Sequence, residues 1–228
     1  MEVVTIQENK QKPVPIPAGY AYLLPSRVRH SPRRQAHSVG LVIERARQPG
    51  ELDSMCWFVD DRSGEVLWEK YFVCNDLGKD LIPVVNEFQA SEEAKTGKPK
   101  SKPLGLHVPL APTVPAPIRF QDKVDQVLRT KKDMAIFGDS HPDREFDVVL
   151  EAEGERTWRD RDEVFLYQVK GSARLGNGDV TLNEGECAVI QLTQANNILR
   201  IHRAPGSVGL VVAVRDIQGN KLPLKARL

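Results

Sequence analysis

The sequence contains little cysteine, few aromatic residues and no excess charge of one sign. Its 228 residues include three cysteines, 6% aromatic residues and 32 basic against 31 acidic side chains, which gives a formal net charge of +1. Three widely spaced cysteines without a Cys-x-x-Cys pair predict neither a disulfide framework nor a zinc ribbon, but free thiols in a reducing compartment. A near-neutral chain does not indicate nucleic acid or an anionic membrane as its partner.

Long hydrophobic runs are missing as well. No run approaches the roughly 18 residues that a membrane-spanning helix needs, and residues 1–6 lack the basic start and apolar stretch of a signal peptide. The hydrophobic fraction of 40% is sufficient for a globular core. We therefore expect a soluble cytosolic protein with one large domain or two small ones.

Proline is concentrated in one segment of the chain. Six of the sixteen prolines lie between residues 97 and 117. This composition favours an extended, semi-stiff linker over the interior of a strand or helix. We expect two domains at residues 1–97 and 118–228, joined by a linker at residues 98–117.

Short runs of β-branched and apolar residues, separated by turn residues, dominate both parts. Such spacing predicts a β-sandwich or barrel rather than a βαβ fold. Two segments instead have apolar residues at helical spacing. One begins at an Asp80 cap and ends before Gly97, and the other covers residues 120–128. The predicted strands cover residues 20–24, 39–43, 148–150, 164–169, 188–192 and 208–214.

The two parts share a faint internal repeat. Residues 38–44 are similar to residues 207–213, and Arg34 and Arg203 each lie four residues before the first serine of these runs. A glycine also precedes each run at a similar distance. Duplication explains three landmarks in the same order better than chance does, so we expect two similar all-β modules.

His30 is the first candidate for a functional residue. It lies between two predicted strands, in a segment that Pro25 and Pro32 stiffen. A stiff loop suits a metal ligand because the position of the imidazole is set before the metal binds. A hydrogen-bonded loop histidine without a metal is the alternative.

Glu44 and Arg34 form the second candidate feature. Glu44 follows the apolar run at residues 39–43, and a carboxylate there is costly unless it is paired or meets a ligand. Arg34 lies on the preceding segment and could be its partner. A structural salt bridge and a substrate-binding pair both remain open on this reasoning.

The strongest signal is a resemblance to a known family. Residues 22–34 and 38–45 resemble the 3-hydroxyanthranilate 3,4-dioxygenase family, in its animal-type, single-chain form. The similarity is nearly continuous from residue 19 to residue 99, and weaker in the second part. Its other landmarks lie at residues 67–78, 91–99, 137–139 and 167–171.

The resemblance implies an all-β bicupin, that is two jelly-roll cupin modules, with a few short helices. It implies ferrous iron (Fe²⁺) held by two histidines and one glutamate, and extradiol cleavage of 3-hydroxyanthranilate by dioxygen, leading to quinolinate and NAD. By resemblance, His30 is a metal ligand, Arg34 binds the substrate carboxylate, and Glu44 binds polar ring substituents and assists proton transfer. The expected protein is a monomer without nucleic-acid or membrane partners.

The chain departs from the family pattern in one respect. The family's His-x5-Glu metal motif is missing, so that the first cupin is incomplete, and the second module, at residues 118–228, is expected to be metal-free. A single imidazole holds ferrous iron poorly, so the chain alone is expected to be a weak or inactive enzyme. A fragment, an isoform and a pseudoenzyme are the three explanations. The alternative function is a non-catalytic cupin that binds a small carboxylate through Arg34, or a partner protein.

Overall fold

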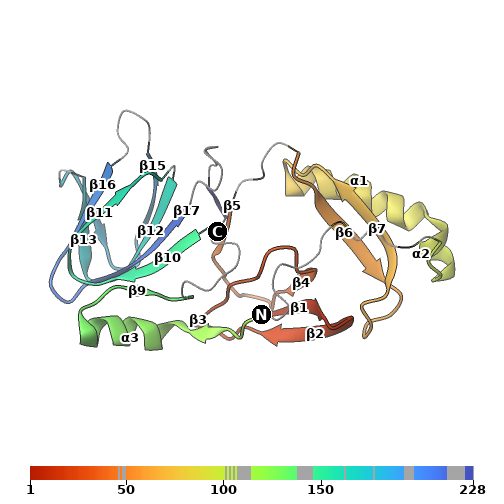
Figure 1. Ribbon diagram of the computed structural model, residues 1–228, viewed down its shortest axis with the longest axis horizontal. Coiled ribbons are helices and arrows are strands. Elements are labelled where there is room, and N and C mark those ends of the chain that lie inside the picture. Colours follow the sequence, from red (N-terminus) through yellow and green to blue (C-terminus); the bar gives the residue numbers. More distant parts are fainter. Residues whose placement is uncertain are drawn as a thin grey trace. The chain divides into compact units, whose positions relative to one another are not determined.

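The computed structural model shows a predominantly β-stranded protein and confirms the expected all-β class with a few short helices (Figure 1). Contacts divide the chain into two compact units. Unit 1 comprises Met1–Ala18, Tyr22–Ser38 and Arg47–Pro117, and unit 2 comprises Gly19–Ala21, Val39–Ala46 and Ile118–Leu228. The structure describes residues 1–45, 47, 50–100, 102, 104, 106, 114–137, 146–161, 163–176, 178–192, 198–214 and 224–227.

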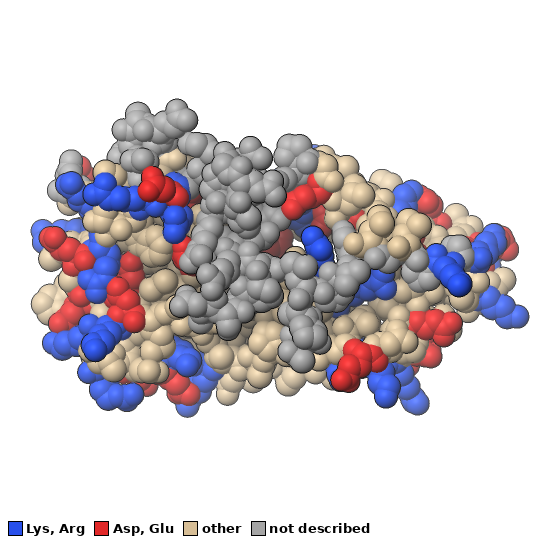
Figure 2. Space-filling model, in the orientation of Figure 1, with Lys and Arg blue, Asp and Glu red and all other residues tan. Residues whose placement is uncertain are grey.

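The predicted domain division at residues 1–97, 98–117 and 118–228 stays a prediction. Within the expected linker, residues 101, 103, 105 and 107–113 lie outside the described residues. In the described part of the chain, no helix has both the length and the apolar character needed to cross a membrane. On the visible face, Lys and Arg are interspersed with Asp and Glu over the described residues (Figure 2).

Unit 1 begins with a three-stranded antiparallel sheet in the order β2-β1-β4. Strands β1 (Glu2–Gln7) and β2 (Lys10–Pro15) form a hairpin. Its two turn residues have φ values of 51° and 57°, which is the type I′ geometry that suits the twist of a tight hairpin. Strand β4 (His30–Arg33) pairs with the other edge of β1. This sheet positions the segment that carries the candidate histidine.

The rest of unit 1 is a β-hairpin that packs against a helix. Strands β6 (Asp53–Phe58) and β7 (Val66–Phe72) pair antiparallel. Helices α1 (Leu77–Ala90) and α2 (Glu92–Thr96) follow. Trp57 stacks on Phe88 of α1 with ring centroids 4.0 Å apart, and Trp68 meets Trp57 edge to face. Stacked and edge-to-face aromatic contacts of this kind join the hairpin to the helix.

The predicted start of the first helix is wrong by four residues. Asp76, and not Asp80, is the N-cap, because its carboxylate accepts a hydrogen bond from the Gly78 amide. Asp80 lies one turn inside the helix and accepts from the amides of Asn75 and Asp76. These amide hydrogen bonds lower the pKa of Asp80. The segment is also two helices and not one, because α1 ends at Ala90 and Ser91 caps α2, which Gly97 closes in the left-handed conformation with φ of 65°.

Unit 2 is a sandwich of two antiparallel sheets with strand orders β15-β12-β17-β10-β9 and β11-β16-β13-β14. Its main core lies between the sheets and includes Val164, Leu166, Ile201 and Val211, all at most 1% exposed. The strands are β9 (Met134–Ala135), β10 (Phe146–Glu151), β11 (Gly154–Arg159), β12 (Glu163–Lys170), β13 (Ser172–Leu175), β14 (Val180–Asn183), β15 (Cys187–Gln191), β16 (Ile198–Arg203) and β17 (Val208–Val214).

Helix α3 (Phe120–Thr130) packs on this sandwich through Val124 and Val127, which are buried as the helical spacing predicted. Two segments from earlier in the sequence complete unit 2. Strand β3 (Tyr20–Ala21) pairs with β8 (Ile118–Arg119), and β5 (Val42–Arg45) pairs with β18 (Leu224–Arg227).

The strand predictions differ in accuracy between the two parts. The predicted strand at residues 208–214 coincides with β17, and the other three predicted strands of the second part overlap β10, β12 and β15. The predictions at 20–24 and 39–43 are too long or shifted, because β3 and β5 extend only where β8 and β18 offer backbone partners.

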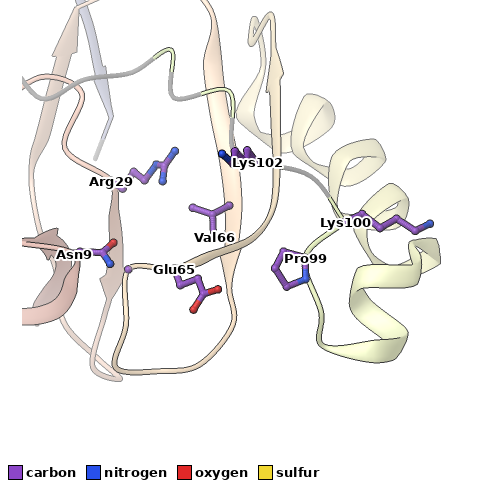
Figure 3. A pocket seen from close by; sticks show the side chains of 8 residues that line it. Asn9, Arg29, Glu65, Val66, Pro99, Lys100 and Lys102 are labelled. Carbon is purple, nitrogen blue, oxygen red and sulfur yellow. The ribbon is translucent and has the colours of Figure 1, made fainter.

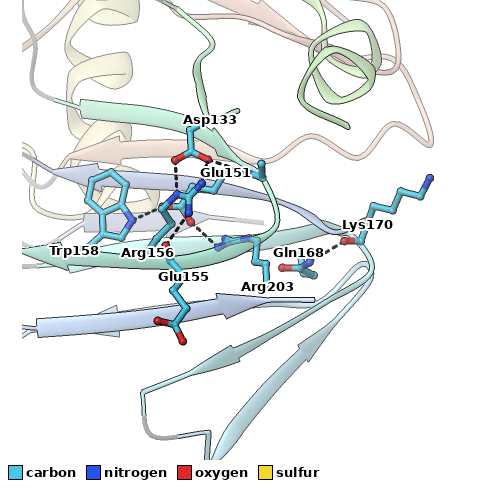
Figure 4. A network of polar contacts seen from close by, with 9 residues as sticks. Asp133, Glu151, Glu155, Arg156, Trp158, Gln168, Lys170 and Arg203 are labelled. Carbon is cyan, nitrogen blue, oxygen red and sulfur yellow. Dashed lines mark hydrogen bonds and ion pairs between the residues drawn. The ribbon is translucent and has the colours of Figure 1, made fainter. Parts of the chain in front are cut away.

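A buried polar network crosses unit 2 (Figure 4). Glu151 on β10 accepts hydrogen bonds from the Trp158 indole N–H at 2.6 Å and from Nη1 of Arg203 at 2.5 Å. The side chains of Arg203 and Glu151 are 1% and 2% exposed. Burial raises the pKa of Glu151 and lowers that of Arg203, although the opposite charge of each partner partly compensates. The pair links β10 to β16 in the interior.

Asp133, next to this network, gives a prediction about acid stability. Partial burial acts to raise its pKa, but hydrogen bonds from Arg156 and the Ala152 amide outweigh it, so the pKa is lowered. A carboxyl whose pKa is lowered by folding stabilises the protein above its unfolded pKa of about 3.9 and loses this contribution as the pH falls through the folded pKa. We expect Asp133→Asn to be less stable than wild type at pH 7, with the difference shrinking below about pH 4.

Urea unfolding of both proteins at neutral and acidic pH measures this effect. The ionised Asp133 is not the source of the stability if the two unfolding midpoints differ by the same amount across the pH range.

Candidate active site

The sequence predicted a loop at His30, but the structure places His30 at the start of strand β4. It pairs with Thr5 because β1 offers this segment a free edge. Its Nδ1 lies 2.9 Å from the Val28 carbonyl oxygen. A carbonyl can only accept, so Nδ1 carries the hydrogen and Nε2 of the neutral ring retains its lone pair. The ring is exposed. The contact of Nδ1 with Val28 fixes the orientation of the ring, and histidines that bind a metal through Nε2 typically make a hydrogen bond of this kind through Nδ1.

Arg34 follows β4 directly and is exposed. Within the described residues it makes no hydrogen bond or ion pair. Its neighbour Arg33 contacts Glu2 across the sheet at 3.3 Å. Of these two arginines, Arg34 has the guanidinium that remains available for an anionic ligand.

Glu44 lies on β5, where the register places it opposite Lys225 of β18. It belongs to unit 2, whereas His30 and Arg34 belong to unit 1. The structure thus places His30 and Arg34 on one segment and determines no distance from them to Glu44. An Arg34–Glu44 pair stays a prediction.

The metal site needs more ligands than this segment supplies. In the described ranges, no group of three or more His, Cys, Asp or Glu side chains is placed to hold a metal ion. His30 fits the role of one ligand through Nε2, but the donor set around it does not by itself fit a complete centre.

Sequence reasoning assigned no role to Arg29. Arg29 donates through Nη2 to Glu69 of β7, whose side chain is only 4% exposed. The Tyr71 hydroxyl donates to the same carboxylate oxygen at 2.8 Å. Glu69 and Tyr71 are two positions apart on β7, and residues at this spacing lie on the same face of a strand. This spacing was the signal in the sequence that could have shown that the two side chains meet.

Two further ionisable groups in unit 1 are half-buried. Cys56 stands opposite Glu69 in the hairpin register, and burial raises the pKa of its thiol. Burial also raises the pKa of Tyr22 to about 12. The Tyr22 hydroxyl has no hydrogen-bond partner among the described residues. These groups stay protonated at neutral pH and do not form a nucleophile there.

The antiparallel β architecture, with an imidazole prepared for a metal and an available guanidinium four residues later, fits the class of cupin-type oxygenases. The model of the 3-hydroxyanthranilic acid dioxygenase family matches residues 1–89. The 3-hydroxyanthranilate 3,4-dioxygenase of Nematostella vectensis is 37% identical over 95% of this chain and 78% of its own length. The enzymes of Mus musculus and Homo sapiens are 34% and 33% identical, over 91% and 93% of this chain and 73% and 75% of their own lengths.

The chain therefore belongs to the 3-hydroxyanthranilate 3,4-dioxygenase family. Membership implies a metal cofactor and small-molecule substrates. Among solved structures, a cupin-2 domain protein from Shewanella frigidimarina matches 43% of this chain and 94% of its own, with a TM-score of 0.32 and 18% identity. A Vibrio parahaemolyticus protein of unknown function matches 30% of this chain and 72% of its own, with a TM-score of 0.24 and 15% identity.

Proposed function

We propose that this chain acts on 3-hydroxyanthranilate, as the ring-cleaving part of a ferrous-iron dioxygenase whose product leads to quinolinate and NAD. The observation that carries this proposal is the identity of 33–37% to enzymes of this name over more than 90% of the chain. The available Nε2 of His30 and the unpaired guanidinium of Arg34 support it, because the substrate carries a carboxylate and the reaction needs a metal.

Each candidate residue then has a distinct role. His30 would contribute one imidazole ligand to the iron. Arg34 would hold the substrate carboxylate by a charge-assisted, bidentate contact and so orient the ring. Glu44 would accept hydrogen bonds from the ring hydroxyl and amino groups, and could take a proton from them.

We also propose a role for the second module, an oligomeric state and a cellular location. Residues 118–228 would support the fold without binding metal, and the protein would be a monomer in the cytosol. Cys56, Cys74 and Cys187, all of them described residues, form no disulfide, which supports a reducing compartment.

The test is dioxygen consumption by the 228-residue protein, loaded anaerobically with ferrous iron and then given 3-hydroxyanthranilate. Consumption coupled to loss of the substrate's absorbance supports the proposal, and it would show that ligands beyond His30 complete the iron site. Folded protein that binds iron but consumes no dioxygen would contradict the proposal for this chain.

Arg34→Ala should raise the Michaelis constant by about tenfold or more with a smaller change in kcat, because the carboxylate contact exists before and during the reaction. Arg33→Ala is the matched control, since it removes the same charge from the neighbouring position. Equal Michaelis constants for wild type and Arg34→Ala would exclude this role.

A second candidate is a non-catalytic cupin that binds a small carboxylate through Arg34. The available guanidinium and the incomplete donor set around His30 favour it. Calorimetric titration with 3-hydroxyanthranilate separates the two functions, because binding without turnover supports the second and excludes the first.

A further inference from the structure

Unit 1 contains a cavity of about 640 Å³ that the proposed active site does not use. Neither His30 nor Arg34 is among its lining residues. The volume falls in the range of pockets that take up small molecules. The lining residues come from three separate parts of the chain and are Asn9, Arg29, Gly64, Glu65, Val66, Pro99, Lys100 and Lys102 (Figure 3).

Positive charge converges on this cavity. Arg29 and Lys102 extend into it toward each other, whereas Lys100 and Glu65 point away (Figure 3). Arg29 donates to Glu69 through Nη2, and its Nη1 makes no hydrogen bond among the described residues. Lys102 makes no hydrogen bond or ion pair with any residue that the structure describes. Glu69 offsets part of the Arg29 charge, and an oxyanion between Nη1 of Arg29 and the Lys102 ammonium would be attracted to both.

The two walls are tied to one carboxylate. Arg29 donates to Oε1 of Glu69, and the Tyr71 hydroxyl donates to the same oxygen at 2.8 Å. The backbone N–H of Leu106 donates to the Tyr71 hydroxyl at 3.0 Å. Glu69 itself is 4% exposed, so its contacts with Arg29 and Tyr71 are sheltered from water.

We propose that this cavity binds a small phosphate-bearing molecule, whose oxyanion lies between Arg29 and Lys102. A guanidinium presents its N–H groups as a planar fork that fits oxyanions, and a lysine ammonium adds a point charge from the other side. The remaining volume accommodates the rest of the molecule, along Val66 and Pro99. This site is separate from the proposed dioxygenase function and does not depend on it.

The test is calorimetric titration of the 228-residue protein with inorganic phosphate and with pyrophosphate. We expect saturable binding that weakens as potassium chloride is added, because salt screens the charges. Lys102→Gln should weaken binding by roughly fivefold or more, since it removes one of the two facing cations. Lys98→Gln is the matched control, because Lys98 is an exposed lysine of the same segment that does not line the cavity.

A second variant tests the other wall without removing the ion pair that holds it. Arg29→Lys keeps a cation for Glu69 but loses Nη1, the guanidinium nitrogen that Glu69 does not use, so binding should weaken here too. Absence of saturable binding overturns the proposal, and so does an equal effect of Lys98→Gln and Lys102→Gln, which would show only general attraction of anions.

Discussion

The Arg203→Met variant is expected to lose about 3–5 kcal/mol of unfolding free energy, because it leaves the buried Glu151 carboxylate without its counter-charge. Glu151 is 2% exposed and cannot recover hydration while the sandwich stays closed. Its remaining hydrogen bond, from the Trp158 indole, is neutral and does not replace the guanidinium. Single domains have only about 5–15 kcal/mol of stability in total, so the loss would be severe.

Urea unfolding followed by circular dichroism measures this loss. The matched control is the double variant Arg203→Met, Glu151→Leu, which removes both charges and keeps apolar volume. We expect it to recover much of the stability, since replacing a buried ion pair with apolar residues is often neutral. A double variant as unstable as Arg203→Met would show that lost packing, and not the unpaired charge, causes the effect.

Gly209→Ala is the second substitution with a large expected effect. A Cβ atom built on Gly209 would lie 2.6 Å from Cζ of Arg203 and closer still to Nε and Nη2. The guanidinium cannot move away, because it is buried and paired with Glu151. Overpacking of this kind typically costs about 1–3 kcal/mol. We expect a loss in this range, measured by the same urea unfolding.

Gly40→Ala is the control, since a Cβ there meets nothing within 4 Å. The cause can be tested further in the Arg203→Met background, where Gly209→Ala should cost less because the guanidinium is gone. Full additivity of the two substitutions would contradict a direct contact between position 209 and the Arg203 side chain.

Features that depend on local pattern could be predicted from the sequence. The run at residues 208–214 is apolar on both faces, and β17 lies in the middle of its sheet. The apolar spacing from residue 120 predicts α3 because one face of that helix is buried. Gly97 ends a helix because glycine adopts positive φ at little cost.

The candidate site also has features that the sequence predicted and features that only the structure showed. The sequence identified His30 and Arg34 by resemblance, and the residues around them place both on one segment. The Val28 contact that sets the tautomer of His30 comes from the backbone path of that segment. No sequence pattern could show it, because a backbone carbonyl is common to every residue type.

By itself, then, the sequence determined the all-β class, the family and the candidate residues, since these depend on composition, periodicity and motif. Only the tertiary structure decided that His30 begins a strand, that Arg29 pairs with Glu69, and that Glu151 meets Arg203 from 52 positions away. These features join parts of the chain that are distant in sequence. Burial and pairing across such distances depend on which strands become neighbours, and local propensity does not encode that choice.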